Sequence, residues 1–242
     1  MVKVETFDIH FDNPDEVFFA GELLSGVVVL VLQDEKKIDE ILLELKGKAK
    51  TYWTKSSGKS RKHFSDSEPY FCHQFNTEYT HAYGKPKERV LSKGRHEIPF
   101  TFTLPKTLPC SFEGEYGHIR YTCKAILERP WDFDIIAKKV YTVVGHEDLN
   151  DDVKALDSVK LSDSQFDLKF CCSKKGTITI DMSVPKSGFT PGEKVPIDAQ
   201  VINQSSRSLS YCCVRVKQHT IYKAKSFGGQ QLVKELSKVS FG

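Results

Sequence analysis

The chain has 242 residues, of which 39% are hydrophobic and 28% charged, a composition typical of an ordinary soluble globular protein with one large or two modest domains. Its formal net charge of +3 is too small to indicate nucleic-acid binding by itself, and its longest apolar run, residues 27–32, is far too short to span a membrane. The first residues resemble neither a secretory signal nor a myristoylation site, so we expect a cytoplasmic protein with at most peripheral membrane contact.

Alternation of apolar and polar residues predicts that most of residues 1–145 form β-strands. Ile41, Leu43 and Leu45 alternate with charged residues, and the same period of two recurs over residues 98–104, 117–128 and 133–144. Pro99 has no N–H to donate, so its strand should lie at a sheet edge or lose its pairing at that position. Many strands and no long amphipathic helix predict an all-β fold, an immunoglobulin-like antiparallel β-sandwich.

Residues 3–30 are repeated at residues 174–201, which predicts two similar domains. At an offset of 171 residues the identical pairs are Lys3/Lys174, Thr6/Thr177, Ile9/Ile180, Pro14/Pro185, Phe18/Phe189, Gly21/Gly192 and Glu22/Glu193. In the second copy, Pro191 and Gly192 suit a type II turn, whose third residue needs a positive φ.

Between the two copies the alternation lapses and acidic residues accumulate, so residues 146–167 are predicted to be a linker with a short helical turn near residues 153–159. Residues 168–242 then form only part of a second sandwich, because at the repeat's offset the counterparts of the first domain's later strands fall beyond residue 242. A strand set without its facing sheet should be poorly protected from amide exchange unless it finds a partner.

A basic stretch is the sharpest local feature. It carries seven cationic residues and no acid: Lys46, Lys48, Lys50, Lys55, Lys59, Arg61 and Lys62. The first three should share one strand face, and the others should lie in a Ser/Gly-rich loop. Two interpretations stay open: a solvated face with a mobile loop, or a contact for anionic lipid, acidic tails or phosphorylated cargo.

The seven cysteines (72, 110, 123, 171, 172, 212 and 213) show no metal-ligand spacing, so we expect reduced thiols, no metal and no cofactor. Cys213 is the candidate reactive thiol, because on a strand it would share a face with Arg215 and Lys217, and nearby cations lower a thiol pKa. The sequence contains no recognisable nucleophile–base–orienter set, so no catalytic residue and no enzymatic activity are predicted.

Several motifs together resemble those of the α-arrestins, the arrestin domain-containing proteins. They are GRHEIPFTF (residues 94–102), FEGEYGHIRY (112–121), ERPWDF (128–133) and GFTPGE (188–193), in a resemblance that runs from about residue 5 to residue 242. The signature positions, expected to be structural, are Gly21, Glu22, Pro99, Phe100, Gly114, Tyr116, Gly117, Arg120, Tyr121, Pro191, Gly192 and Glu193.

The resemblance implies two arrestin-like β-sandwich domains, the second incomplete, in a non-enzymatic adaptor. Such a protein would link membrane cargo, such as receptors and transporters, to endocytosis, sorting and ubiquitination at the plasma membrane or endosomes. Family members recruit WW-domain ubiquitin ligases through Pro-Pro-x-Tyr motifs in a tail, and this sequence contains no such motif. The alternative is a thiol-dependent binding protein of the thioredoxin-interacting type.

Overall fold

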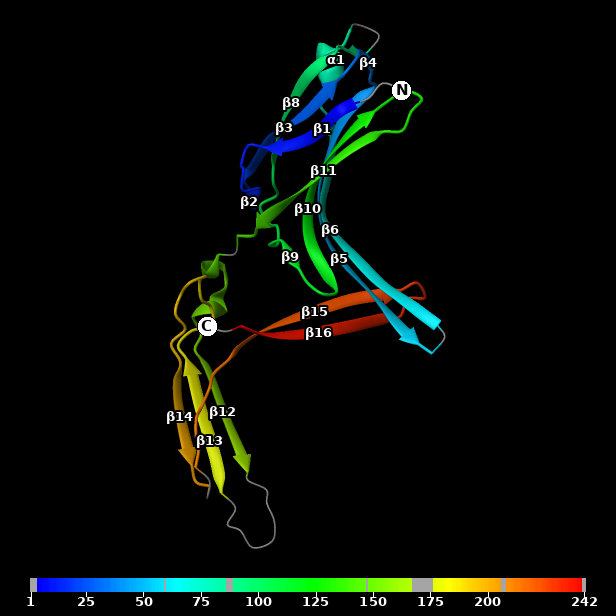
Figure 1. Ribbon diagram of the computed structural model, residues 1–242. Helices are drawn as coiled ribbons and strands as arrows, with labels where there is room; N and C mark the ends of the chain where they lie inside the picture. Colours follow the sequence, from blue (N-terminus) through cyan, green and yellow to red (C-terminus); the bar gives the residue numbers. More distant parts are fainter. Residues whose placement is uncertain are drawn as a thin grey trace. The chain divides into compact units, whose positions relative to one another are not determined.

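The computed structural model describes residues 4–58, 60–85, 89–146, 148–166, 176–205 and 208–240 (Figure 1). Its contacts divide the chain into two compact units. The first unit comprises Met1–His146 together with His219–Lys238, and the second comprises Glu147–Gln218 with Val239–Gly242. The first unit therefore includes a hairpin from the far end of the chain.

The first unit contains thirteen strands and one short helix in the part described. These are β1 (Val4–Phe11), β2 (Val17–Phe19), β3 (Leu23–Leu32), β4 (Lys36–Lys37), β5 (Glu40–Ser57), β6 (Ser60–Asn76), α1 (Tyr79–Tyr83), β7 (Val90–Leu91), β8 (Gly94–Thr103), β9 (Phe112–Glu113), β10 (Gly117–Glu128), β11 (Ile135–Val144), β15 (Val216–Ser226) and β16 (Gln231–Ser240). The second unit contains the 3-10 turns η1 (Leu149–Asp151) and η2 (Val153–Leu156), followed by β12 (Val159–Phe166), β13 (Thr177–Val184) and β14 (Asp198–Asn203).

Two sheets face each other in the first unit, which confirms the predicted all-β sandwich. One sheet has the order β1-β3-β8, and the other has the order β16-β15-β6-β5-β10-β11-β2. The pairings within β1-β3-β8 and within β15-β6-β5-β10-β11 are antiparallel, and β11 pairs with β2 in parallel. Pro99 of β8 lies opposite Val27 of β3. β8 is an edge strand, as the missing N–H of Pro99 predicts.

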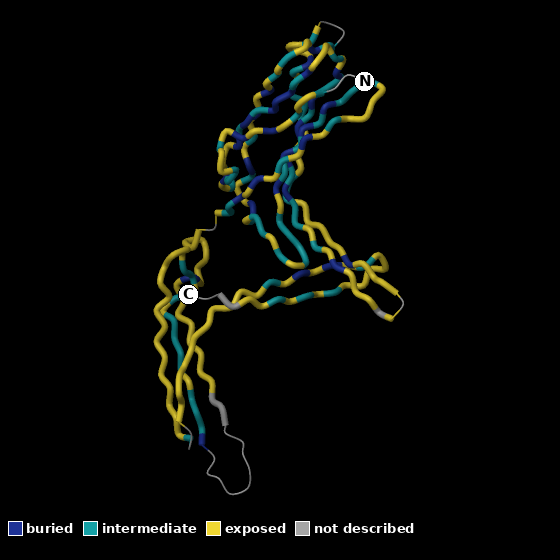
Figure 2. The backbone as a smooth tube through the Cα atoms, in the orientation of Figure 1, coloured by how far each residue is buried: buried dark blue, intermediate teal, exposed yellow. Residues whose placement is uncertain are grey.

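The core forms because apolar residues of both sheets point inward, largely at every second position. Figure 2 shows buried residues alternating with more exposed ones along these strands. Ile41, Leu43 and Leu45 of β5 are fully buried and belong to this core. Phe11, Phe18 and Tyr141 close one part of it with edge-to-face ring contacts at centroid distances of 5.6–5.8 Å. The first unit thus has a continuous core that holds its strands in register.

The second unit is a three-stranded antiparallel sheet of order β12-β13-β14. The sequence placed residues 159–166 in the linker, but they form β12, paired with β13 from Val159 opposite Val184 onward. The strand was not predicted because Val159 and Leu161 alternate with polar residues only at its start. Acidic and hydroxyl side chains then follow without an apolar partner until Phe166. No described side chain of these three strands is buried, so the sheet has little core of its own (Figure 2).

The internal repeat reappears as equivalent strands. When the sequence is aligned with itself at the repeat's offset, β13 corresponds to β1, β14 to β3, β15 to β5 and β16 to β6. The turns before β3 and in the second copy are also alike: Gly21 has φ 83° and Gly192 has φ 84°. In each copy the glutamate that follows accepts a hydrogen bond from a backbone N–H three residues earlier, Glu22 from Phe19 at 2.6 Å and Glu193 from Thr190 at 3.0 Å. The Gly-Glu pairs are therefore turn-forming residues.

Replacing Gly192 with valine is expected to destabilise this turn by about 1–2 kcal/mol, because a β-branched residue is strained at a φ of 84°. Gly192→Asn is the matched control, since asparagine tolerates positive φ and the added Cβ meets no atom within 4 Å. Hydrogen exchange of the β13 and β14 amides should be faster in the valine variant alone. Equal exchange in both variants would contradict the turn assignment.

Candidate functional site

The basic stretch divides between two faces of the β5–β6 hairpin. Lys46, Lys48 and Lys50 share the outer face of β5, as the alternation predicts. Lys55 and Lys62 lie opposite one another on the other face, the one that carries Trp53. Arg61 pairs with Ser56 and so shares the outer face, whereas Lys59 lies outside the described residues. Residues 55–62 were expected to be a loop, but residues 55–57 end β5 and residues 60–62 begin β6, and Gly58 has φ 59°.

Neighbouring strands extend the cationic outer face. On β10, His118 lies opposite Lys50 and Arg120 opposite Lys48. On the same side, Lys124 of β10 lies opposite Lys138 of β11. Neither lysine could be found from sequence spacing, because only the strand register places them on the same sheet face as the β5 lysines.

Two acids neutralise part of this face: Glu44 of β5 lies opposite Lys124, and Glu113 of β9 pairs with Arg120. Glu113 receives two hydrogen bonds from Arg120, at 2.5 Å from Nε and 2.8 Å from Nη2, and these bonds lower the pKa of Glu113. The pKa of His118 is lowered by burial and by Arg120, so the imidazole is neutral at pH 7. The cationic character of the outer face therefore comes mainly from the lysines, which we call the lysine face: Lys46, Lys48, Lys50, Lys124 and Lys138.

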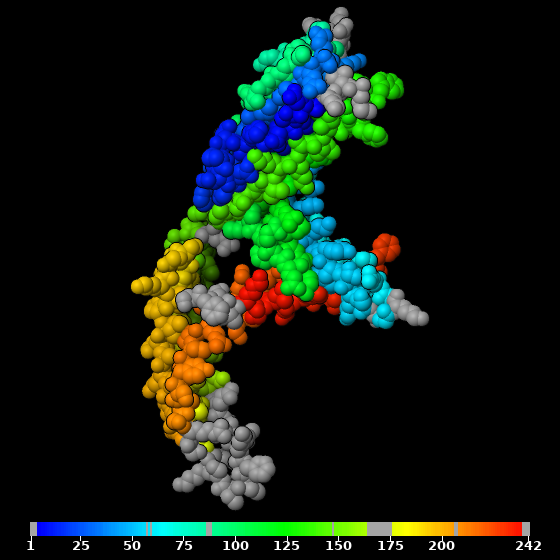
Figure 3. Space-filling view, in the orientation of Figure 1, coloured from blue at the N-terminus to red at the C-terminus, as the bar shows by residue number. Residues whose placement is uncertain are grey.

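A second cluster joins the two hairpins of the first unit. Trp53 and Phe64 of β5–β6 are buried together with Tyr222 and Ala224 of β15. The strands are also joined through the backbone, since β15 pairs with β6 at Lys225–Ser65 and the Thr51 hydroxyl donates to the Lys223 carbonyl at 2.7 Å. In Figure 3 the orange and red atoms of β15 and β16 lie against the cyan atoms of β5–β6.

The signature residues of 112–121 serve this second cluster. The Tyr116 ring meets Trp53 and Tyr222 edge to face, at centroid distances of 6.0 Å and 5.7 Å, and the Lys234 ammonium lies 3.6 Å from its centroid. A Cβ on Gly114 would stand 2.1 Å from the Tyr222 hydroxyl oxygen, so only glycine fits there. Sequence spacing could not reveal these contacts, because the partners lie more than sixty residues apart.

The other signature residues are parts of the framework. Phe100 is buried in the core, and the Tyr121 hydroxyl donates to the Pro109 carbonyl at 2.6 Å. A Cβ on Gly117 would stand 2.7 Å from the Lys50 carbonyl oxygen, which explains the glycine at that strand start. Pro191 precedes Gly192 in the exposed turn of the second unit.

The cysteines differ in environment. Cys123 is fully buried in the core, and burial raises its pKa to about 12, so it stays a protonated thiol at neutral pH. Cys213 is exposed, but β15 begins at Val216, so Cys213 and Arg215 do not lie on that strand. Cys171 and Cys172 lie outside the described residues. Within the described ranges, no three His, Cys, Asp or Glu side chains converge as metal ligands would.

Two family models match the chain, one over each copy of the repeat. The model of the arrestin (or S-antigen) N-terminal domain matches residues 7–150, and that of the arrestin C-terminal domain matches residues 174–240. The chain is 52% identical to arrestin domain-containing protein 17 of Caenorhabditis elegans over 99% of this chain and 57% of that protein. It is 29% identical to human arrestin domain-containing protein 4 over 85% of this chain and 50% of that protein. The chain thus spans about half the length of these curated relatives.

Among solved structures, the sporulation control protein Spo0M of Bacillus subtilis covers 96% of this chain and 90% of its own, with 15% identity and a TM-score of 0.38. That score is too low to support an argument. None of the helices in the described residues is long and apolar enough to cross a membrane.

Proposed function

Since the chain belongs to the arrestin family, we propose that it is a non-enzymatic adaptor that links membrane cargo, such as receptors and transporters, to endocytosis, sorting and ubiquitination. The observation that carries this proposal is the match to both arrestin domains in order, on a β-sandwich whose signature residues form turns and hairpin contacts. The adaptor acts by surface complementarity, at the cytoplasmic side of the plasma membrane or of endosomes. This sequence lacks a Pro-Pro-x-Tyr motif, so WW-domain ubiquitin ligases bind only if the protein carries that motif outside these 242 residues.

The lysine face is the surface we assign to an anionic partner in this function. It lies on the outer side of a sheet whose inner side is packed against the buried core, so the spacing of its lysines along the backbone is set before a partner binds. Lys46, Lys48 and Lys50 are spaced at every second residue, which suits a flat anionic surface better than a single phosphate.

Neutralising this face is expected to weaken binding to vesicles that contain anionic lipid. The variant Lys46→Gln/Lys48→Gln/Lys50→Gln should lose roughly 100-fold in affinity, because each lysine near such a surface contributes about 1 kcal/mol. The control Lys55→Gln/Lys62→Gln removes charge from the other face of the same hairpin and should have a far smaller effect. Vesicle co-sedimentation at several salt concentrations measures both. Equal losses in the two variants, or none, would sink the assignment.

The adaptor proposal itself is tested by tagging the full-length protein in cells. Purification scored for endosomal coat proteins, cargo receptors and WW-domain ligases should recover at least one of these classes. The redox alternative predicts instead a mixed disulfide with thioredoxin that disappears in Cys213→Ser. Recovery of the disulfide alone, without trafficking proteins, would replace the adaptor proposal with that alternative.

A further inference from the structure

The turn between β10 and β11 holds two large aromatic side chains in solvent. Trp131 is 104% exposed and Phe133 is 90% exposed, although the turn joins two strands whose inner faces are well buried. Isolated exposed apolar residues are common, but two neighbouring aromatic rings on one short turn are the kind of exposed apolar feature that marks interaction sites. We call Trp131 and Phe133 the aromatic knob.

A nearly buried arginine holds this turn in one shape. The Arg129 side chain is only 12% exposed, and it forms an ion pair with Asp132 at 2.5 Å. Its guanidinium also donates to the Phe133 carbonyl from both Nε, at 2.8 Å, and Nη2. The Asp132 carboxylate in turn accepts from the Phe133 N–H at 2.9 Å. The aromatic knob is therefore preorganised rather than loose.

The backbone at Trp131 is strained, with φ 63° in a bulky residue that rarely adopts a positive value. Such strain costs about 1–3 kcal/mol and persists only where the surroundings enforce it, as Arg129 does here. Neither the strain nor the exposed rings contribute to the stability of the first unit. Tryptophan beside arginine is also the composition enriched in the energetic centres of protein interfaces.

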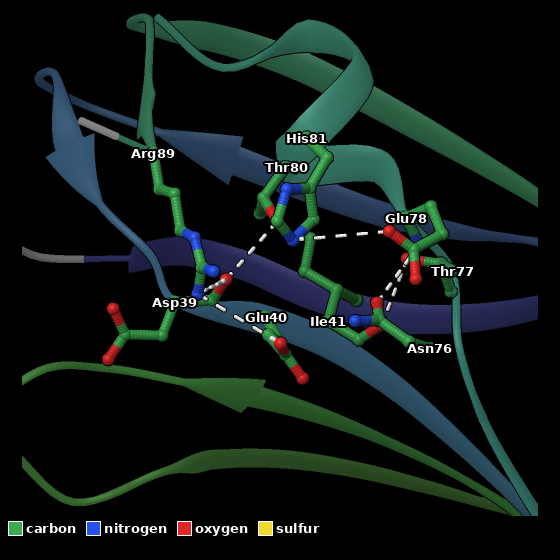
Figure 4. A network of polar contacts seen from close by, with 9 residues as sticks. All are labelled: Asp39, Glu40, Ile41, Asn76, Thr77, Glu78, Thr80, His81 and Arg89. Carbon is green, nitrogen blue, oxygen red and sulfur yellow. Dashed lines mark hydrogen bonds and ion pairs between the residues drawn. The ribbon is translucent and has the colours of Figure 1, made fainter. Parts of the chain in front are cut away.

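The charges around the aromatic knob are mainly acidic. Glu128 lies opposite Glu40, and the pKa of Glu128 is raised by burial and by Glu40, Asp134 and Asp39. The cations nearby are already engaged: Arg129 with Asp132, and Arg89 with the Asp39 carbonyl at 3.4 Å and Glu40 at 3.9 Å (Figure 4). The half-buried Lys36 has its pKa lowered by burial and by Arg129. The aromatic knob thus protrudes from a rim of carboxylates that is fixed in place.

We propose that Trp131 and Phe133 are a docking knob for a partner protein that offers an apolar socket surrounded by lysine and arginine. The acidic rim complements such a socket and repels an anionic membrane surface, so a membrane is not the partner of this turn. The proposal goes beyond the adaptor function and makes no use of the lysine face. A protein that failed to bind anionic vesicles through its lysines would still dock through this knob.

The test places a photo-crosslinking residue, benzoylphenylalanine, at position 131 of the full-length protein in cells. Irradiation should give a discrete adduct, and mass spectrometry should map the attachment to an apolar pocket flanked by lysine or arginine. The adduct should fall at least about tenfold with Phe133→Ala, because truncating an interface anchor removes more than 1 kcal/mol. Benzoylphenylalanine at Phe227, which is 110% exposed in the β15–β16 turn, is the matched control and should not give this adduct.

Two further measurements decide the outcome. Phe133→Ala should leave the melting temperature unchanged, since the ring is exposed, so that loss of the adduct is not a loss of folding. In Trp53→Phe, the emission of Trp131 should not shift when phosphatidylserine vesicles are added. A blue shift with vesicles, the same adduct from position 227, or no discrete adduct from position 131 would each overturn the proposal.

Discussion

Replacing Gly47 with valine is expected to destabilise the first unit by about 3 kcal/mol, the upper part of the range for overpacking a dense core. Gly47 is buried in the middle of β5, between Tyr121 on β10 and Phe71 on β6. A Cβ at this position would stand 2.5 Å from Cε1 of Tyr121 and 2.8 Å from Cε1 of Phe71. Both distances are shorter than carbon atoms can approach without displacement of a ring.

Neither ring can move away at low cost. The Tyr121 hydroxyl is held by the Pro109 carbonyl at 2.6 Å, and its ring packs on Tyr141 at a centroid distance of 6.0 Å. The Phe71 ring is stacked on Phe102 at 5.7 Å. A larger residue at position 47 therefore displaces a hydrogen-bonded tyrosine or opens the contact between the two sheets.

Urea unfolding measures the loss, and Gly228→Ala is the control for a glycine substitution that should be neutral. A Cβ on Gly228 would meet only the Ser226 hydroxyl oxygen, at 4.0 Å. We expect its midpoint to stay close to that of the unchanged protein, while Gly47→Val shifts far below it. If Gly47→Val unfolds at the unchanged midpoint, the close packing of Tyr121 and Phe71 over this glycine is wrong.

Local patterns predicted those features that depend on neighbours along the chain. The alternation of Ile41, Leu43 and Leu45 is a direct consequence of one buried and one solvated sheet face, so it located β5 and the fold class. The Pro-Gly pair at 191–192 required a positive φ and has one. The repeat likewise predicted the equivalence of β1 with β13, because both strands precede the same Gly-Glu turn at the same offset.

Features that depend on strand register could not be read in this way. Lys124 joins the β5 lysines only because β10 pairs with β5 in one particular register. A register shift of β6 beside Gly47 reverses which of its side chains face inward, and so places Phe64 beside Trp53. The pairing of β15 with β6 joins residues that are about 160 positions apart, for which no local pattern exists.

The position of β15 and β16 in the first unit was not foreseen, and the domain boundaries at residues 145–146 and 167–168 remain a prediction. The sequence assigned residues 168–242 to the second sandwich, whereas contacts place His219–Lys238 with the first unit. The face of β15 that is buried there carries Tyr222 and Ala224, the same face that β5 uses for its own core residues. The apolar face of the β15–β16 hairpin gains free energy by leaving water, and the apolar side chains that cover it are those of Trp53 and Phe64.

Replacing Trp53 with alanine should therefore release the β15–β16 hairpin rather than unfold the whole first unit. Removing a buried tryptophan costs about 3–5 kcal/mol, and Trp53 stacks on Phe64 at a centroid distance of 6.1 Å in a cluster separate from the main core. The loss falls on the contacts with Tyr222, Tyr116 and Lys234, which hold the hairpin. Amide exchange should accelerate strongly in β15 and in the outer half of β6, while β10 and β11 stay protected.

Trp53→Phe separates the role of the ring from that of the indole nitrogen. The Trp53 Nε1 is buried without a hydrogen-bond partner among the described residues, so its removal relieves an unsatisfied donor, which costs about 1–3 kcal/mol. A phenylalanine keeps an aromatic face toward Phe64 and Tyr116. The removal of the unsatisfied donor offsets the loss of buried area that the smaller ring causes. We expect hairpin exchange close to that of the unchanged protein in Trp53→Phe and fast exchange in Trp53→Ala. Slow β15 exchange in the alanine variant would mean that backbone pairing with β6 holds the hairpin, and that the aromatic cluster does not.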